Sequence, residues 1–275
     1  MTKRRALGQH FLRDHAIARA IVDIVAPTAQ DLVVEIGPGD GALTGLLAGR
    51  AARVIALEID RALGAALRAR LPAVEVLDAD ARTWDYAALA APAGGRVLIL
   101  GNLPYSVGKP ILTALIAARA AIDEMALMLQ REVAERIAAP PGKMSYLSVF
   151  VQYHARVRIA FEVPPTAFEP EPAVDSAVIV VEPYPDDDRL DAATEDELWR
   201  LVQAAFRERR KMIHNVLSRQ LPVSAERVDA ALAAAGIAPD RRPQTLAVGE
   251  WLALQEALGP IGPDPRGRRT AAEDP

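Results

Sequence analysis

Residues 32–47 read LVVEIGPGDGALTGLL, a short apolar run that leads into three closely spaced glycines and then into a helical pattern. An apolar run without polar alternation predicts a strand that is buried on both faces of a sheet. Glycine permits a sharp turn and lets a ligand come close to the main chain. This stretch therefore predicts the strand, glycine loop and helix of a ligand-binding α/β protein.

Similar apolar runs recur up to residue 183, with Ala- and Leu-rich helical stretches between them. They are residues 32–36, 53–57, 73–77, 96–100, 125–129, 156–163 and 176–183. The alternation predicts a doubly wound, seven-stranded, mostly parallel sheet of the Rossmann-like α/β class. The last two strands are joined by a Pro-rich loop with no room for a crossover helix, so we expect them to be antiparallel neighbours.

The composition changes at PYPDDDRLDAAT, an acidic segment that begins at residue 183 and is followed by helical patterns. We expect a first domain over residues 1–185, a small helical domain over residues 186–262 and a disordered tail over residues 263–275. In the helical domain the patterns run to about residue 220, then from 224 to 235 and from 248 to 258. Gly236 and Gly259 are the expected stops of the last two helices.

The composition excludes several classes of protein. The chain has 275 residues, 51% hydrophobic content and no cysteine, which predicts a globular protein without disulfides or thiolate zinc sites. Its four histidines include no HExxH motif, so we expect no metal. No apolar run is long enough to span a membrane, and the N-terminus lacks the apolar core of a signal peptide. We therefore expect a cytoplasmic protein.

The ends of the predicted strands carry groups that suit a nucleoside. Gly37 and Gly39 lie in the glycine loop, and Glu58 ends the second strand, where it can accept hydrogen bonds from ribose hydroxyls. Asp80 follows the third strand and can accept a hydrogen bond from an adenine amino group. The G-x-G-x-G spacing, with Glu35 before it, favours S-adenosylmethionine (SAM) over a dinucleotide. A purely structural glycine turn and a helix-capping role for Asp80 remain alternatives.

The tetrapeptide Asn102-Leu103-Pro104-Tyr105 directly follows the fourth strand. The Asn102 side chain and the Pro104 main chain offer two carbonyl oxygens, which can accept hydrogen bonds from an exocyclic amine and localise its lone pair. Tyr105 offers a ring on which a base can stack. Orientation and electrostatics would then promote methyl transfer without a strong general base. The alternative is a simple turn, because Asn-x-Pro also favours turns.

A basic region lies in the predicted helical domain, although the whole chain carries a net charge of −4. Between residues 199 and 220 the single acid is Glu208, and the basic residues are Arg200, Arg207, Arg209, Arg210, Lys211 and Arg219. We expect one helix here, which places Arg200, Arg207 and Lys211 on one stripe with Arg210 at its edge. The stripe favours contact with RNA phosphates over a solvated face, because solvated faces usually mix charges of both signs.

These segments resemble those of the bacterial small-subunit rRNA adenine N6,N6-dimethyltransferases, the KsgA/RsmA family. The resemblance covers nearly the whole chain and runs through LGQHFLRD, VVEIGPGDGALT, VIALEIDRAL, DADARTW, GNLPYSVGKPIL, FEPEPAVDSAVI, AFRERRKMIHNVL and RPQTLAVGEWLAL. It implies a class I SAM-dependent methyltransferase fold and dimethylation of adjacent adenosines in 16S rRNA of the assembling 30S subunit. We also expect a monomer that binds neither a membrane nor a metal.

The resemblance further implies roles for single residues. SAM contacts are implied at His10, Leu12, Gly37, Glu58, Asp80 and Asn102. The target-adenine pocket is implied at Asn102–Tyr105, with Phe168 closing on the other face of the base, although Phe168 taken alone fits a core residue. The chain departs from the family at His10, where Asn is usual, and at Ala173, where Lys is common.

Other functions stay open. An enzyme of the antibiotic-resistance type would methylate 23S rRNA of the large subunit, whereas a ribosome-assembly factor on the same fold would need no catalysis. FEPEPAVDSAVI and the RRKMIHN segment look like the small-subunit group, and the intact Glu58, Asp80 and Asn102–Tyr105 argue for catalysis. A nicotinamide-dependent dehydrogenase would leave the tetrapeptide unexplained.

Overall fold

The structure is a computed structural model that describes residues 10–104, 108–185 and 190–262. The described residues divide into two compact units. The first comprises the residues up to Glu135 together with His154–Pro185, and the second comprises Arg136–Tyr153 and the residues from 190 onward. Residues 136–153 thus group with the C-terminal helices, although they precede the expected boundary at 185/186. The tail expected at 263–275 lies outside the described residues.

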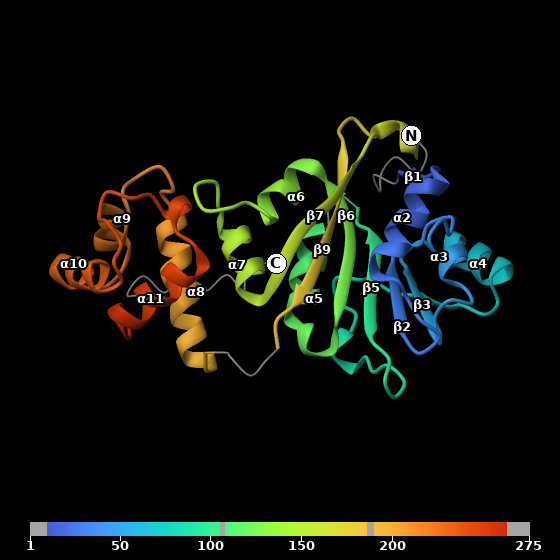
Figure 1. Cartoon of the computed structure of the whole chain (residues 1–275), viewed down its shortest axis with the longest axis horizontal. Coiled ribbons are helices and arrows are strands. Elements are labelled where there is room, and N and C mark those ends of the chain that lie inside the picture. The colour runs from blue at the N-terminus through green and yellow to red at the C-terminus, as the bar shows by residue number, and fades with distance from the viewer. Residues whose placement is uncertain (1–9, 105–107, 186–189, 263–275) are drawn as a thin grey trace. The chain divides into compact units, whose positions relative to one another are not determined.

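The described part of the first unit contains a seven-stranded sheet (Figure 1). Its strands are β2 (Leu32–Ile36), β3 (Arg53–Glu58), β4 (Glu75–Asp78), β5 (Val97–Asn102), β6 (Glu124–Gln130), β7 (Ala155–Val163) and β9 (Ser176–Pro183). Their order is β4-β3-β2-β5-β6-β9-β7, with β2 to β6 parallel and β9 antiparallel to both of its neighbours. The predicted, mostly parallel, doubly wound sheet and its antiparallel last pair are confirmed.

The apolar runs form strands because helices cover the sheet. All five residues of β2 are buried. One face packs against α2 (His15–Val25), α3 (Thr44–Leu47) and α4 (Arg61–Arg70), whose apolar side chains share a core with β2, β3 and β5. Asp14 and Asp60 cap α2 and α4, because each carboxylate accepts hydrogen bonds from N–H groups of the first helical turn.

Shorter elements complete this part of the chain. They are α5 (Gly108–Ala117), α6 (Arg131–Ile137), and the 3-10 turns η1 (Tyr86–Ala88), η2 (Arg119–Ala121) and η3 (Pro165–Ala167). Two short strands, β1 (Phe11–Leu12) and β8 (Phe168–Glu169), pair with each other in an antiparallel ladder apart from the main sheet. This small ladder joins the start of the described chain to the loop before β9.

The second unit is helical (Figure 1). Its elements are α7 (Tyr146–His154), whose last residue belongs to the first unit, α8 (Ala192–Phe206), α9 (Ile213–Gln220), α10 (Ala225–Ala234), η5 (Pro243–Thr245) and α11 (Val248–Leu258). The fully buried Trp251 lies in its core. Gly236 and Gly259 follow α10 and α11 with φ of 67° and 61°, which confirms the predicted stops. No described helix has the length and hydropathy that a membrane-spanning segment requires.

The expectation of one continuous helix over residues 199–220 is wrong. Helix α8 ends at Phe206 and α9 begins at Ile213, with a turn between them. The first N–H groups of α9 donate to carbonyls of a loop distant in sequence, at 2.7 Å from Ile213 to Arg241 and 3.3 Å from His214 to Pro239. These tertiary contacts replace the hydrogen bonds that a continuous helix would have made.

Candidate functional site

The carboxyl ends of β2, β3 and β5 form one edge of a cleft of about 330 Å³. The parallel register sets Ile36 of β2 opposite Leu57 of β3 and Gly101 of β5, so the three strands end side by side. The predicted residues that line the cleft are His10, Leu12, Gly37, Gly39, Glu58, Asp80, Asn102, Leu103 and Pro104. The structure thus brings groups from five separate parts of the chain to one place.

The glycine loop packs against Phe11, near the start of the described chain. Gly39 has a φ of 56°, a conformation that favours glycine, and its N–H donates to Glu58 Oε2 at 3.0 Å. A Cβ atom added at Gly39 would lie 3.1 Å from two ring carbons of Phe11. The absence of a side chain therefore lets the Phe11 ring pack on the loop beside the cleft.

Glu58 lines the cleft, and the residue is only 3% exposed. Burial raises its pKa, while hydrogen bonds from the main-chain N–H groups of Asp60 and Gly39 act to lower the pKa. Asp60 N donates to Oε1 at 2.9 Å, so each carboxylate oxygen is held by one main-chain donor. Each oxygen keeps acceptor capacity, which suits a pair of ligand hydroxyls.

The Asp80 carboxylate is hydrogen-bonded to Arg82, two residues later in the chain. The carboxylate accepts hydrogen bonds from Arg82, at 2.9 Å from the main-chain N–H, 3.0 Å from Nε and 2.6 Å from Nη2. The side-chain bond from Arg82 holds the pKa of Asp80 below its ordinary value. Both residues line the cleft. A ligand amine at Asp80 must therefore share the carboxylate with Arg82, a residue that the sequence analysis missed.

Asn102 is the last residue of β5 and lies between two fixed pieces of main chain. Its Nδ2 donates to the carbonyl oxygen of His10 at 3.1 Å. The next residue, Leu103, is buried and its N–H donates to Met128 O at 3.0 Å. With Nδ2 on His10, Oδ1 of Asn102 is the acceptor that remains for a ligand amine. Tyr105, the predicted stacking partner, lies outside the described residues.

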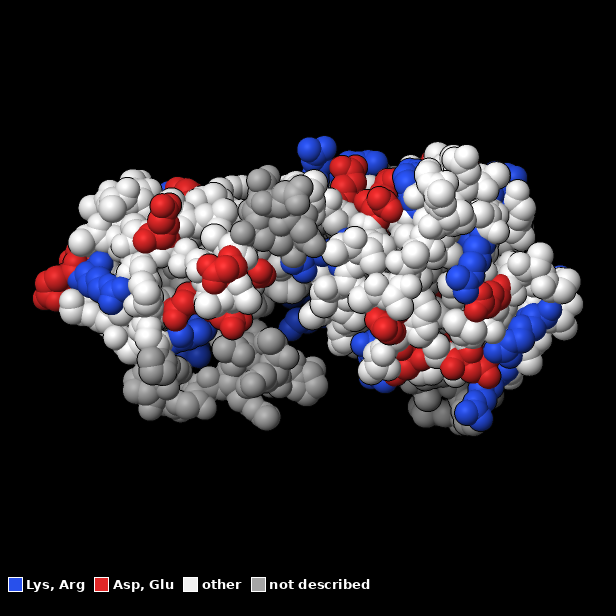
Figure 2. Space-filling view, turned by 90° about the horizontal axis from the view of Figure 1, so that it is seen from below, with Lys and Arg blue, Asp and Glu red and all other residues white. Residues whose placement is uncertain are grey.

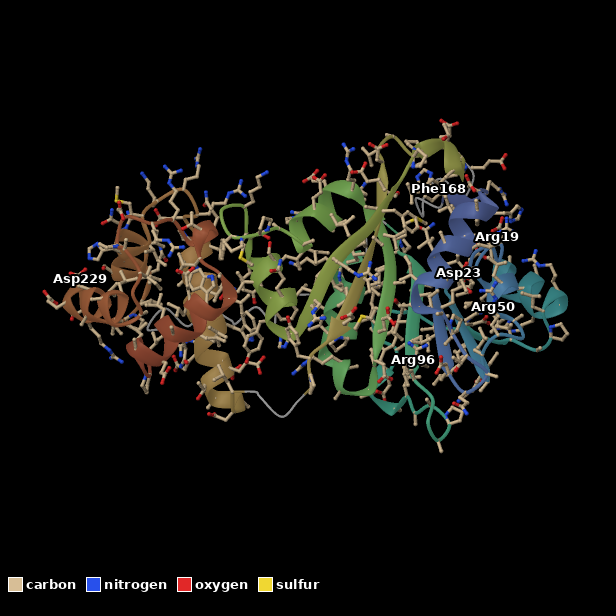
Figure 3. The ribbon with its side chains drawn as sticks, viewed as in Figure 1. Arg19, Asp23, Arg50, Arg96, Phe168 and Asp229 are labelled. Carbon is tan, nitrogen blue, oxygen red and sulfur yellow. The ribbon has the colours of Figure 1, made fainter. Side chains whose placement is uncertain are left out.

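Phe168 is not among the residues that line the cleft. Figure 3 labels it near Arg19 of α2. Its side chain is 4% exposed and packs in the core that α2 shares with the sheet. Its main chain pairs with Leu12 in the β1–β8 ladder. A clamp role on a bound base would require the ring to leave this packing.

Two further cleft residues were not predicted as site residues. Ile59, directly after Glu58, is 57% exposed although it is apolar, and it lines the cleft. Glu35 is 2% exposed, and its Oε2 has no hydrogen-bond partner among the described residues. Burial raises the pKa of Glu35 to about 7, although Thr44 acts to lower the pKa. An acid inside an apolar strand was the available sequence signal for Glu35.

The predicted basic stripe is replaced by a basic turn, residues 207–212 between α8 and α9. Arg207, Arg209, Arg210 and Lys211 are all exposed there. Arg200 stands apart from them on α8, where it bonds to Glu197 at 3.0 Å and to the Gly262 carbonyl. Four exposed basic side chains therefore lie in the basic turn, whereas the guanidinium of Arg200 is bonded to Glu197 and Gly262.

The fold and the cleft define a class I methyltransferase. The model of the family described as "Ribosomal RNA adenine dimethylase" matches residues 1–259, and the chain belongs to this family.

Individual relatives agree with this membership. A "Ribosomal RNA small subunit methyltransferase A" of Methylibium petroleiphilum is 40% identical over 259 residues, which are 94% of this chain and 97% of the relative. The protein of the same name from Anaeromyxobacter dehalogenans is 42% identical over 267 residues, 93% of each chain.

Two solved structures are similar over most of the chain. A dimethyladenosine transferase from Plasmodium falciparum is 25% identical with a TM-score of 0.77, and the match covers 89% of this chain and 96% of that one. The 23S rRNA methyltransferase ErmE is 29% identical with a TM-score of 0.73, and the match covers 90% and 99%.

The raised pKa of Glu35 predicts a pH dependence of stability. A carboxyl with a pKa of about 7 when folded, against 4.5 ordinarily, binds its proton more tightly in the folded state. The free energy of unfolding contributed by Glu35 is therefore fully present below about pH 4.5 and is lost as the pH rises towards 7, by on the order of 2–3 kcal/mol. Glu35→Gln should remove this decline, as measured by urea unfolding of the ligand-free protein between pH 4.5 and 8.

The control variant is Glu75→Gln, which makes the same substitution at an exposed glutamate of β4. Parallel stability curves for the wild type and Glu35→Gln would show that Glu35 titrates alike in the folded and unfolded chains.

Proposed function

We propose that this methyltransferase uses SAM to dimethylate N6 of adenosines in 16S rRNA, on small ribosomal subunits during their assembly. The observation that carries the proposal is the cleft, which joins Glu58 and Asp80 to Asn102 and Pro104. Relatives named for the small subunit support this substrate, because they share 40% and 42% identity over nearly the whole chain. ErmE, named for 23S rRNA, shares 29%.

The chemistry of the cleft fits SAM. Glu58 supplies acceptors for the ribose hydroxyls, Asp80 supplies an acceptor for the adenine amine, and the apolar Ile59 supplies a surface for the flat ring. Oε2 of Glu35, which has no hydrogen-bond partner among the described residues, fits a cationic group, because a buried acceptor gains most from a charged donor. Leu12, Gly37 and Gly39 complete the proposed cofactor site.

SAM supplies an electrophilic methyl group when it is bound. The protein contributes the orientation of the attacking amine: Asn102 Oδ1 and the Pro104 carbonyl accept its two N–H bonds and localise the nitrogen lone pair. Adjacent Leu103 is buried, which fixes the main chain between the two acceptors. Holding the reacting atoms about 3–3.5 Å apart can lower a barrier by roughly 7–11 kcal/mol. Tyr105 and Phe168 are proposed to stack on the target base.

The basic turn is the proposed RNA contact of the second unit. On the face drawn in Figure 2, basic and acidic side chains are interspersed over the first unit, a pattern typical of a solvated surface. In the basic turn, Arg209, Arg210 and Lys211 make no ion pair with the described residues. Arg210 and Lys211, with Arg207, can therefore contact phosphates without first breaking a strong intramolecular pair.

The experiment that tests the function incubates the protein with methyl-labelled SAM and ribosomal subunits from cells that lack this modification. Separate small and large subunits are supplied, and the modified bases are mapped. We expect label in N6,N6-dimethyladenosine of 16S rRNA alone. Label in 23S rRNA would support the antibiotic-resistance alternative, and no label in either subunit would support a non-catalytic assembly factor.

Loss of the Glu58 carboxylate should weaken cofactor binding. Glu58→Ala removes at least one hydrogen bond to a charged group, worth about 1.5–3 kcal/mol, so the dissociation constant of SAM should rise by at least roughly 10- to 150-fold. Calorimetric titration measures the change. The control is Glu75→Ala, at an exposed glutamate that pairs with Arg53 on the surface. Equal SAM affinity for Glu58→Ala and the wild type would remove Glu58 from the site.

Loss of two charges from the basic turn should flatten the salt dependence of RNA binding. Each lost phosphate contact lowers the slope of log affinity against log salt by a little under one unit. Arg210→Ala combined with Lys211→Ala should therefore bind small subunits less tightly at low salt, with unchanged SAM affinity. The control pair, Arg53→Ala with Arg156→Ala, makes the same change of net charge at the opposite edge of the sheet from the cleft. Parallel slopes for the basic-turn variant and the wild type would mean that the turn is only solvated.

A further inference from the structure

Segment 10–13 connects the cleft to the loop that carries β8. Phe11 and Leu12 pair with Glu169 and Phe168, and the N–H of Arg13 donates to Ala167 O at 2.7 Å. The Arg13 side chain reaches Glu169 at 3.1 Å and also pairs with Asp40 of the glycine loop. These contacts fix the segment against both the β8 loop and the glycine loop.

Hydrogen bonds join His10 both to the loop that carries β8 and to Asn102. Its ring Nδ1 lies 2.7 Å from the Pro170 carbonyl oxygen, 160 residues away in the sequence. A carbonyl oxygen can only accept, so Nδ1 of His10 carries the proton of this bond. The His10 main-chain carbonyl in turn accepts from Asn102 Nδ2 at 3.1 Å. The bond from the His10 ring to Pro170 therefore fixes His10 in place. The main-chain carbonyl of His10 in turn accepts the hydrogen bond from the Asn102 side-chain amide.

The second bond decides which end of the Asn102 amide is offered to a ligand. Amide orientation follows from the hydrogen-bond partners, and a carbonyl partner requires the NH₂ end. A flipped amide would set Oδ1 against the His10 oxygen, acceptor against acceptor. With Nδ2 committed to His10, Oδ1 is presented as the acceptor that a target amine needs.

We infer that His10 is a positioning residue for methyl transfer, which acts through its main-chain carbonyl to orient the Asn102 amide. The inference rests on the proposed function for its effect on rate, but the orientation of Asn102 is a property of the free protein. It differs from the SAM contact that the family resemblance implies at this position. Nδ1 of the His10 ring is thereby assigned to Pro170.

The sequence offers an unusually direct test, because it contains two asparagines, Asn102 and Asn215. Protein labelled with ¹⁵N at asparagine alone therefore gives two side-chain amide signals in an NMR spectrum. In His10→Ala the Asn102 amide should shift and exchange its hydrogens faster, while the Asn215 amide, in the second unit, should not change. An unchanged Asn102 signal would overturn the inference.

Rate measurements complete the test. His10→Ala should lower the single-turnover rate of methyl transfer by about 10- to 100-fold, because a small misplacement of a reacting group costs up to about 100-fold. Its affinity for S-adenosylhomocysteine, the demethylated cofactor, should stay within about twofold of the wild type, since the Glu58 and Asp80 contacts remain. A large fall in that affinity would place His10 in the cofactor site and overturn the inference.

His10→Asn distinguishes a loss of the positioning hydrogen bond from a general loss of folded structure. Asparagine places an N–H at about the same distance from the main chain as histidine Nδ1, so it should restore most of the rate and the Asn102 signal. The control is His15→Ala, at an exposed histidine on α2 that should leave rate and signals unchanged. If wild-type protein methylates no rRNA, the proposed function fails, while the NMR comparison still decides the orientation of Asn102.

Discussion

The parallel register of β2 with β3 and β5 is the constraint on which the site depends. Because all three strands run in one direction, the groups that follow them meet at a single edge of the sheet. The glycine loop, Glu58 and Asn102 reach the cleft for this reason, although they lie far apart in the sequence. The β1–β8 ladder adds His10 and Leu12 from the side. A shift of β5 by one residue would turn its side chains to the opposite faces and remove Asn102 from the cleft.

Two buried carboxyl groups give the cleft its electrostatic character. Glu58 is held by two main-chain donors, whereas Glu35 keeps an oxygen without a partner among the described residues. Burial raises the pKa of both groups. A cationic ligand would reverse this effect at Glu35, because a nearby positive charge favours the ionised carboxylate. The buried Glu35 therefore lowers the stability of the ligand-free protein, and a bound cationic ligand would offset this cost. Such local destabilisation is common at ligand-binding sites.

Much of the fold and part of the site could be predicted from local patterns. Continuous apolar runs predicted the strands, and Gly236 and Gly259 predicted the helix ends, since these signals act within a few residues. The break before Ile213 could not be predicted, because it depends on carbonyls of Pro239 and Arg241 that only the fold brings near. The grouping of residues 136–153 with the C-terminal helices is equally non-local. In the site, Glu58 and Asn102 were predicted from their places at strand ends, but the Arg82 contact to Asp80 and the exposed ring-sized surface of Ile59 depend on side-chain conformations.

The central claim is that the Asn102 amide, at the carboxyl end of β5, orients the amine that receives the methyl group. The most direct measurement is the single-turnover rate of Asn102→Ala at saturating SAM, with Asn215→Ala, the change at the other asparagine of the sequence, as the control. An interaction made mainly in the transition state should be lost, so we predict a fall on the order of 100-fold or more, with RNA affinity unchanged and the control at the wild-type rate. An unchanged rate together with weaker RNA binding would contradict the account.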